Sequence, residues 1–116
     1  MAIIFHITAG KAWRSAAAEG IYRTETFRTE GFIHCSTAGQ VIQVANIRFR
    51  GQTGLVLLSI ATDKVTAEII FENLEGGPQL FPHIYGELNI DAVIQVAEFE
   101  PAADGHFTLP KGGGVR

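Results

Sequence analysis

The sequence predicts a single α+β domain in which a mostly antiparallel β-sheet is flanked by two helices. The chain has 116 residues, of which 47% are hydrophobic and 18% charged, so it can bury one core and is not intrinsically disordered. Short β-branched and aromatic runs recur along its length, and two segments with helical spacing lie in its first half. Because helices and strands do not alternate strictly, the order favours α+β over α/β.

The first half of the chain contains both predicted helices, each ended by a glycine that can adopt a left-handed conformation. The second helix also begins with capping-box spacing between Thr37 and Gln40. In order, the predicted elements are a strand over 2–8, a helix over 11–19 ended by Gly20, a loop with a short strand over 21–30, a strand over 31–36, and a helix from Thr37 to about Arg50 ended by Gly51.

The second half is predicted to be mostly strands. The most apolar segment, 55–61, is expected to be a buried strand, and a turn at 62–64 separates it from a strand over 67–72. Pro82 restricts the segment 79–85 to a sheet edge or an irregular conformation, because proline cannot donate to a ladder. The last strand is predicted over 92–99. We therefore expect one domain over 1–100, followed by a flexible tail over 101–116, where glycines and prolines gather.

Charge and composition exclude several classes of protein. Nine Lys and Arg against twelve Asp and Glu give a net charge of −3, so bulk binding to a nucleic-acid backbone is not expected. The longest apolar run, 55–61, is too short to cross a bilayer. No basic segment or cleavage site follows Met1, and the single Cys35 fits a reducing compartment. These features predict a cytoplasmic protein.

Three histidines occupy similar local settings and are candidates for one site. His6, His34 and His83 each lie at or near the end of an extended, largely apolar segment. Strand ends present polar groups to a crevice, so the three imidazoles are expected to converge. The alternative interpretation is that each is a structural histidine with its own hydrogen bonds. His106 lies in the predicted tail and is assigned no role.

Other chemistry-bearing side chains leave further alternatives open. A zinc site built from the three histidines remains an interpretation, although neither HExxH nor a paired CxxC is present and no metal is expected. Cys35 follows His34 directly, and neighbouring strand residues point to opposite faces, so His34 is not placed to deprotonate the Cys35 thiol. Cys35 is therefore predicted to be a buried structural thiol rather than a nucleophile. Glu72 ends an apolar strand as a candidate pocket carboxylate. Asn46 lies on the second helix, whose other face is apolar, and it is expected either to contact a ligand or to be exposed to solvent.

Four segments of this chain resemble a small bacterial family known as domain of unknown function 952. The resemblance extends from about residue 3 to residue 99. The segments are FHIT at 5–8, EGFIHCS at 30–36, VANIRF at 44–49 and FPHIYGELN at 81–89.

That family is in turn similar to the ADP-ribosyltransferase superfamily, which includes the RNA 2′-phosphotransferases and binds NAD in the cleft of a split β-sheet. The resemblance implies that His6 with Thr8, and His34 with Ser36, match the superfamily's first two strand motifs. Glu72 matches the third position by order. The segment FPHIYG departs from the pattern, so His83 or Tyr85 is the alternative third residue.

The resemblance implies NAD as a substrate and a transferase reaction on an acceptor. Catalytic roles are then expected for His6, His34, His83 and Glu72. Ligand contacts are expected from Thr8, Ser36 and Asn46, and from Tyr85 or Tyr22, which could stack on the nicotinamide ring. The alternatives are a non-catalytic nucleotide- or metabolite-binding module and a zinc-dependent hydrolase.

Overall fold

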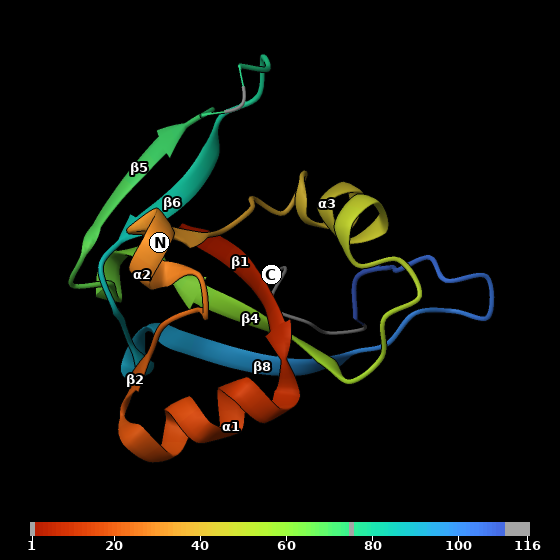
Figure 1. Ribbon diagram of the computed structural model, residues 1–116, viewed down its shortest axis with the longest axis horizontal. Coiled ribbons are helices and arrows are strands. Elements are labelled where there is room, and N and C mark those ends of the chain that lie inside the picture. The colour runs from red at the N-terminus through yellow and green to blue at the C-terminus, as the bar shows by residue number, and fades with distance from the viewer. Residues whose placement is uncertain (1, 75, 111–116) are drawn as a thin grey trace.

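The computed structural model describes residues 2–74 and 76–110, which form three small antiparallel sheets and three helices (Figure 1). The α+β class is confirmed. No helix within these ranges is long and apolar enough to cross a membrane. The elements are β1 (Ile3–Ala9), α1 (Gly10–Glu19), β2 (Ile21–Tyr22), α2 (Phe27–Glu30), β3 (Ile33–His34), α3 (Val41–Arg48), β4 (Leu55–Ala61), β5 (Glu68–Glu72), β6 (Phe81–Tyr85), β7 (Leu88–Asn89) and β8 (Val93–Phe99), with 3-10 turns at Thr62–Lys64 and Ile90–Ala92.

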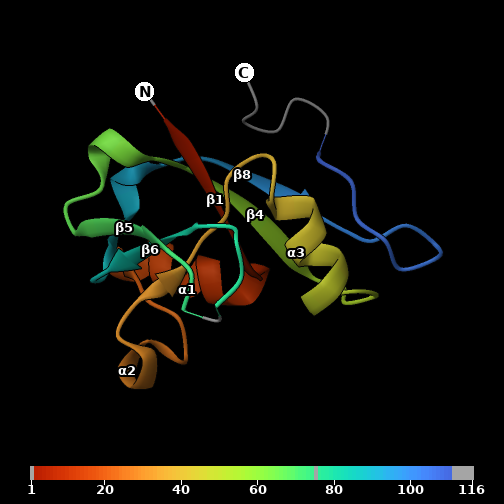
Figure 2. The ribbon, with the colours of Figure 1, turned by 90° about the horizontal axis from the view of Figure 1, so that it is seen from above.

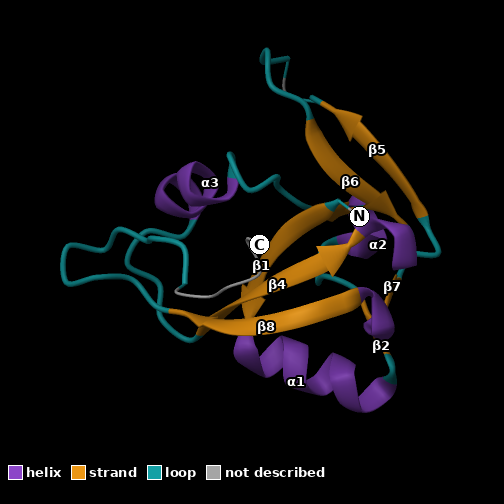
Figure 3. Ribbon diagram, turned by 180° about the vertical axis from the view of Figure 1, so that it is seen from behind, coloured by secondary structure: helices purple, strands orange, loops and turns teal. Residues whose placement is uncertain are grey.

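The central sheet has the order β1-β4-β8 and buries apolar side chains on both faces. On one face Ile4, Leu58 and Ile60 pack with the side chains of α1, and on the other face Phe5 and Leu57 pack with those of α3. This division follows from strand geometry, because neighbouring residues of a strand point to opposite faces. Figures 1 and 3 show α1 along one side of the sheet and α3 on the other side.

A second sheet, of order β3-β6-β5, lies beside the central sheet and contains the β5–β6 hairpin (Figure 2). Residues 33–36 join the two sheets. The Cys35 N–H donates to the Pro82 carbonyl at 3.0 Å, and Phe5 and Ser36 exchange two backbone hydrogen bonds of 2.7 and 2.8 Å. The segment therefore leaves β6 and reaches β1 within two residues.

The prediction that Pro82 confines its segment to an edge or an irregular conformation is wrong, because β6 is the middle strand of its sheet. Pro82 lies opposite Cys35, the first residue after the end of β3, and the Pro82 carbonyl accepts a hydrogen bond from the Cys35 N–H. In an antiparallel pair a residue's N–H and C=O point to the same neighbour. The missing proline N–H thus falls where the regular ladder has already ended, so no ladder bond is lost inside β3.

Local differences from the predicted elements have simple causes. The stretch 21–30, expected to be a loop with a short strand, contains β2 and also α2. Gly31, which the sequence predicts to begin a strand, instead ends α2 at φ +81°. Strand pairing is consequently limited to Ile33–His34. The second predicted helix ends at Arg48 rather than Arg50, and the capping-box contact is half formed, because the Thr37 N–H donates to the Gln40 side chain.

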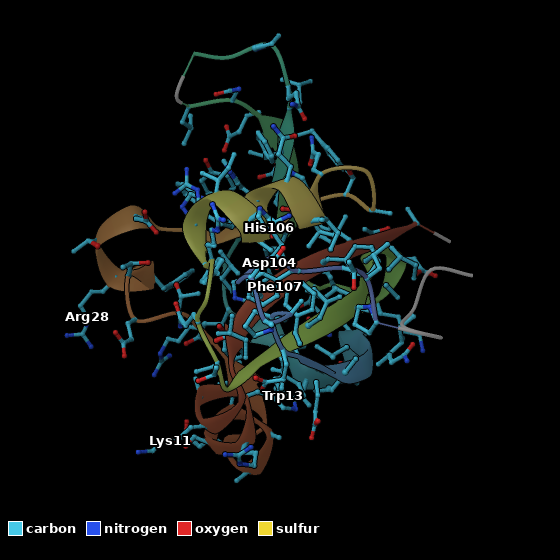
Figure 4. The ribbon with its side chains drawn as sticks, turned by 90° about the vertical axis from the view of Figure 1, so that its right-hand side faces the viewer. Lys11, Trp13, Arg28, Asp104, His106 and Phe107 are labelled. Atoms are coloured by element: carbon cyan, nitrogen blue, oxygen red, sulfur yellow. The ribbon has the colours of Figure 1, made fainter. Side chains whose placement is uncertain are left out.

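Residues 101–110 pack against α3, although the sequence predicted a flexible tail from residue 101. Phe107 is 2% exposed and stacks on Phe99, with ring centroids 4.7 Å apart. Its N–H donates to Asn46 Oδ1 of α3 at 2.7 Å. Figure 4 shows Phe107, His106 and Asp104 beside this helix. The expected tail therefore contributes to the core as far as this segment is described, while 111–116 lie outside the described residues.

Candidate functional site

A cleft of about 810 Å³ lies where β1, β3, α3 and the β5–β6 hairpin meet. Most of the predicted site residues line it. They are His6, Thr8, Tyr22, His34, Ser36, Glu72 and His83. Tyr85 and Asn46 are not among the lining residues, although the Tyr85 hydroxyl contacts the cleft-lining Glu72.

The split between the two sheets brings these residues together. β1 is the edge strand of the central sheet, and beyond its bridge at Phe5 no further strand pairs with that edge within the described residues. His6 and Thr8 share one face of β1, since side chains alternate along a strand. His34 and Ser36 have the same spacing on the joining segment. The two polar pairs therefore reach one cleft from two different sheets.

His6 is buried, and both of its ring nitrogens are hydrogen-bonded inside the protein. Nδ1 lies 2.5 Å from the His34 carbonyl oxygen, and Nε2 lies 2.8 Å from the Tyr22 hydroxyl. A carbonyl only accepts, so Nδ1 has the proton. Burial lowers the pKa of His6 to about 4, which keeps the ring neutral at pH 7. His6 is thus suited to orient its neighbours rather than to transfer protons.

Tyr22 connects His6 to Thr8. Its hydroxyl lies 2.8 Å from His6 Nε2 and 2.9 Å from Thr8 Oγ1, and burial raises the pKa of Tyr22 to about 12. Because Nε2 has no proton in this tautomer, the phenol donates to Nε2 and its oxygen accepts from Thr8. The Tyr22 ring packs against His6 and Trp13, so its hydroxyl is the part that serves the site. The chain of contacts fixes the position of Thr8 at the cleft.

Glu72 joins two side chains of β6 on the opposite wall. Its Oε2 accepts from His83 Nδ1 at 2.8 Å and also from the Tyr85 hydroxyl. These hydrogen bonds, first from Tyr85 and then from His83, lower the pKa of Glu72, whereas the bond to the carboxylate raises the pKa of Tyr85. The carboxylate is therefore ionised at neutral pH. Its Oε1 makes no hydrogen bond within the described residues.

Phe32 and Glu30 belong to this site but were not identified from the sequence. The Phe32 ring stacks on His83 at a centroid distance of 4.3 Å and meets His34 edge-on at 4.8 Å. Glu30 Oε2 lies 3.2 Å from His34 Nε2. Phe32 precedes His34 by two residues in an extended segment, so strand alternation could have placed both on one face.

The remaining candidates have structural surroundings. Cys35 is buried, as predicted for a structural thiol, and burial raises the pKa of its thiol. Asn46 holds the C-terminal segment through Phe107. Within residues 2–74 and 76–110 no group of three or more His, Cys, Asp or Glu side chains has the arrangement of a metal site. Thr24 is one of the residues that line the cleft, and its hydroxyl is buried without a hydrogen-bond partner in the same ranges.

Replacing Glu72 with Gln is expected to lower the pKa of Tyr85 toward its ordinary value near 10. The reason is that a neutral amide stabilises the protonated phenol less than a carboxylate does. An NMR titration of the tyrosine ring carbons measures this, and the chain has only two tyrosines. Tyr22, which does not contact Glu72, serves as the internal control. Equal titration of Tyr85 in both proteins would show that the Glu72–Tyr85 hydrogen bond is absent in solution.

Comparison with known proteins gives one family and closely similar solved structures. Residues 7–96 match the family described as "Protein of unknown function (DUF952)". The crystal structure of protein CC0527 from Caulobacter crescentus aligns with a TM-score of 0.82 and 32% identity, covering 91% of this chain and 93% of that one. The solution NMR structure of CC0527 aligns with a TM-score of 0.80 and 33% identity, covering 91% of each chain. Among curated proteins none matches.

Proposed function

The chain belongs to the DUF952 family, and we propose that its cleft binds NAD and transfers ADP-ribose, with release of nicotinamide, in the manner of an ADP-ribosyltransferase. One observation supports this proposal above the others. The cleft is lined by His6 and Thr8 from β1, by His34 and Ser36 from the joining segment, and by Glu72 from β5, in the chain order of the superfamily motifs.

The chemistry of the bond explains why such a site suffices. Cleavage of the nicotinamide–ribose bond develops positive charge on the ribose, and an ionised carboxylate held in place stabilises that charge. Glu72 meets this need, because two hydrogen bonds hold its Oε2 and lower its pKa, while Oε1 remains for a ribose hydroxyl. Thr8, also at the cleft, supplies a further polar contact for a nucleotide through its hydroxyl.

A non-catalytic nucleotide-binding module is the second candidate, and one observation favours it. Both ring nitrogens of His6 are already bonded to protein groups, so this histidine is not free to hydrogen-bond a ligand in the present arrangement. A sensor needs only the cleft and its polar rim, whereas a transferase also needs the reactive ribose to be positioned.

An NAD titration followed by backbone amide shifts, combined with an assay for released nicotinamide, tests the proposal. We expect shifts at cleft residues and release by the wild type. The Glu72→Gln variant should still bind NAD. Its release of nicotinamide should be slower by a factor of about a hundred or more, as when a preorganised electrostatic contact is removed. His106→Ala is the matched control, because His106 is exposed and does not line the cleft.

Each outcome separates the candidates. Binding together with release supports the transferase, and binding without release supports the module. If cleft amides do not shift at millimolar NAD, the ligand assignment is wrong. If Glu72→Gln releases nicotinamide at the wild-type rate, the Glu72 carboxylate does not stabilise the charge that develops on the ribose.

A further inference from the structure

His83 presents one unused ring nitrogen to the cleft. Its side chain is 6% exposed and lies in the middle strand of its sheet, where it lines the cleft. Nδ1 is hydrogen-bonded to Glu72 Oε2, but Nε2 has no hydrogen-bond partner within the described residues. An almost fully buried imidazole with one open nitrogen at a cleft is a candidate for interaction with a ligand.

The surroundings of His83 fix both its tautomer and its orientation. A carboxylate only accepts hydrogen bonds, so Nδ1 has the proton and Nε2 has the free lone pair. The Tyr85 hydroxyl donates to the same carboxylate oxygen and holds Glu72 in place. The Phe32 ring stacks on the imidazole at an interplanar angle of 21°, and the His34 ring meets it edge-on at 5.0 Å. A histidine that is oriented by a carboxylate at one nitrogen, with the other nitrogen free, is arranged as a general base.

The other two cleft histidines are less suited to this task. Both nitrogens of His6 are bonded inside the protein. The side chain of His34 is 50% exposed, and its Nε2 faces the exposed carboxylate of Glu30. Only His83 combines burial, a fixed tautomer and an open nitrogen among the described residues.

We propose that His83 Nε2 is the general base of the cleft and that the acceptor is water or another molecule that reacts through a hydroxyl group. This inference rests on the proposed function. The acceptor oxygen forms a bond to C1′ of the ribose, and the C1′–N bond breaks with its electron pair leaving on nicotinamide, which departs as a neutral molecule. The acceptor's proton moves to His83 Nε2. In addition to its role at the ribose through Oε1, Glu72 positions His83 through Oε2, and its carboxylate stabilises the positive imidazolium.

The choice of acceptor tests this assignment. NAD is the donor, and nicotinamide release is measured with water and with azide, an anion that has no proton to lose. His83→Asn retains an N–H near the position of Nδ1 but has no group at Nε2. We expect the affinity for NAD to stay within about twofold and the water reaction to fall about 10²- to 10⁴-fold, the usual contribution of a general base. The azide reaction should proceed at the wild-type rate, which also shows that the variant is folded.

Two further variants complete the design. His34→Asn is the matched control, because it removes a neighbouring imidazole of the same cleft; its water and azide reactions are expected to change by the same factor. Glu72→Gln tests the positioning role by nitrogen NMR of the imidazoles. The wild type should show His83 protonated at Nδ1 with Nε2 unprotonated, and the variant should show a mixture of tautomers.

The outcomes distinguish failure of this inference from failure of the proposed function. If the wild type releases nicotinamide but His83→Asn reacts with water at the wild-type rate, or loses the water and azide reactions equally, His83 is not the base and the proposed function stands. The same conclusion follows if Nε2 of the wild type is protonated in the neutral ring. If the wild type does not bind NAD, or binds it without release, the transferase proposal fails and this inference fails with it.

Discussion

Folding stability is expected to fall by up to about 3 kcal/mol as the pH is lowered from 6.5 to 4, because of His6. Burial lowers the pKa of His6 from 6.5 to about 4 in the folded protein. Between these values the unfolded chain binds a proton at His6 that the folded protein does not bind, so acid favours unfolding. Well below pH 4 both states are protonated and this contribution no longer changes. Urea unfolding at a series of pH values measures the effect.

The window above pH 5 isolates His6 from the carboxylates. The pKa values of Glu30 and Glu72 are lowered by hydrogen bonds, so their stabilising effect is present above about 4.5 and is lost at more acidic pH. His6→Asn should be less stable than the wild type throughout, yet its stability should be nearly constant from pH 6.5 to 5. His106→Asn, at an exposed position, should retain the wild-type slope. Parallel curves for the wild type and His6→Asn would show that His6 titrates normally in the folded state.

Replacing Phe107 with Ala is expected to lower the free energy of unfolding by about 3–5 kcal/mol, the range observed for buried Phe→Ala substitutions. The side chain is 2% exposed and stacks on Phe99, so its removal leaves a cavity beside the central sheet. Chemical denaturation followed by circular dichroism measures the loss.

Phe71→Ala is the matched control for this prediction. The same side chain is removed, but Phe71 is 49% exposed on β5 and lies outside both core clusters. The control should lose much less stability than Phe107→Ala. Equal and small losses in both variants would show that residues 101–110 do not pack in solution.

The elements that depend on local pattern were predicted well. The strand over 55–61 was predicted residue for residue, since a seven-residue segment that is apolar except for Ser59 is long enough for a buried strand and too short for most helices. The first helix ends at Gly20 as predicted, where φ is +89° and the glycine N–H donates to the Ala16 carbonyl. Both signals are contained within the segments themselves.

The elements that depend on distant partners were not predicted. Pro82 can occupy a central strand only because β3 ends opposite it, and nothing near Pro82 in the sequence encodes that end. Phe107 is buried because its ring stacks on Phe99 and its N–H donates to Asn46, which lies 61 residues earlier in the chain. A glycine- and proline-rich composition gave the opposite expectation for this segment.

The candidate site shows the same division. The i, i+2 spacing of His6 with Thr8, and of His34 with Ser36, is enough to put each pair on one face of an extended segment. Whether the pairs meet depends on the bridge between Phe5 and Ser36. The two ring nitrogens of His6 are hydrogen-bonded to the His34 carbonyl and the Tyr22 hydroxyl, and no sequence spacing predicts these contacts.

The joining segment also limits how the length of this chain can vary. Its backbone bonds to β6 at Cys35 and to β1 at Ser36, so adjacent residues serve two different sheets. An insertion of one residue here would reverse the faces of all later side chains in the segment or break one of the two attachments. The exposed turn at 76–80, by contrast, can gain or lose residues without moving either attachment. Insertions and deletions among natural variants of this fold should therefore gather at the hairpin turn and avoid residues 33–36.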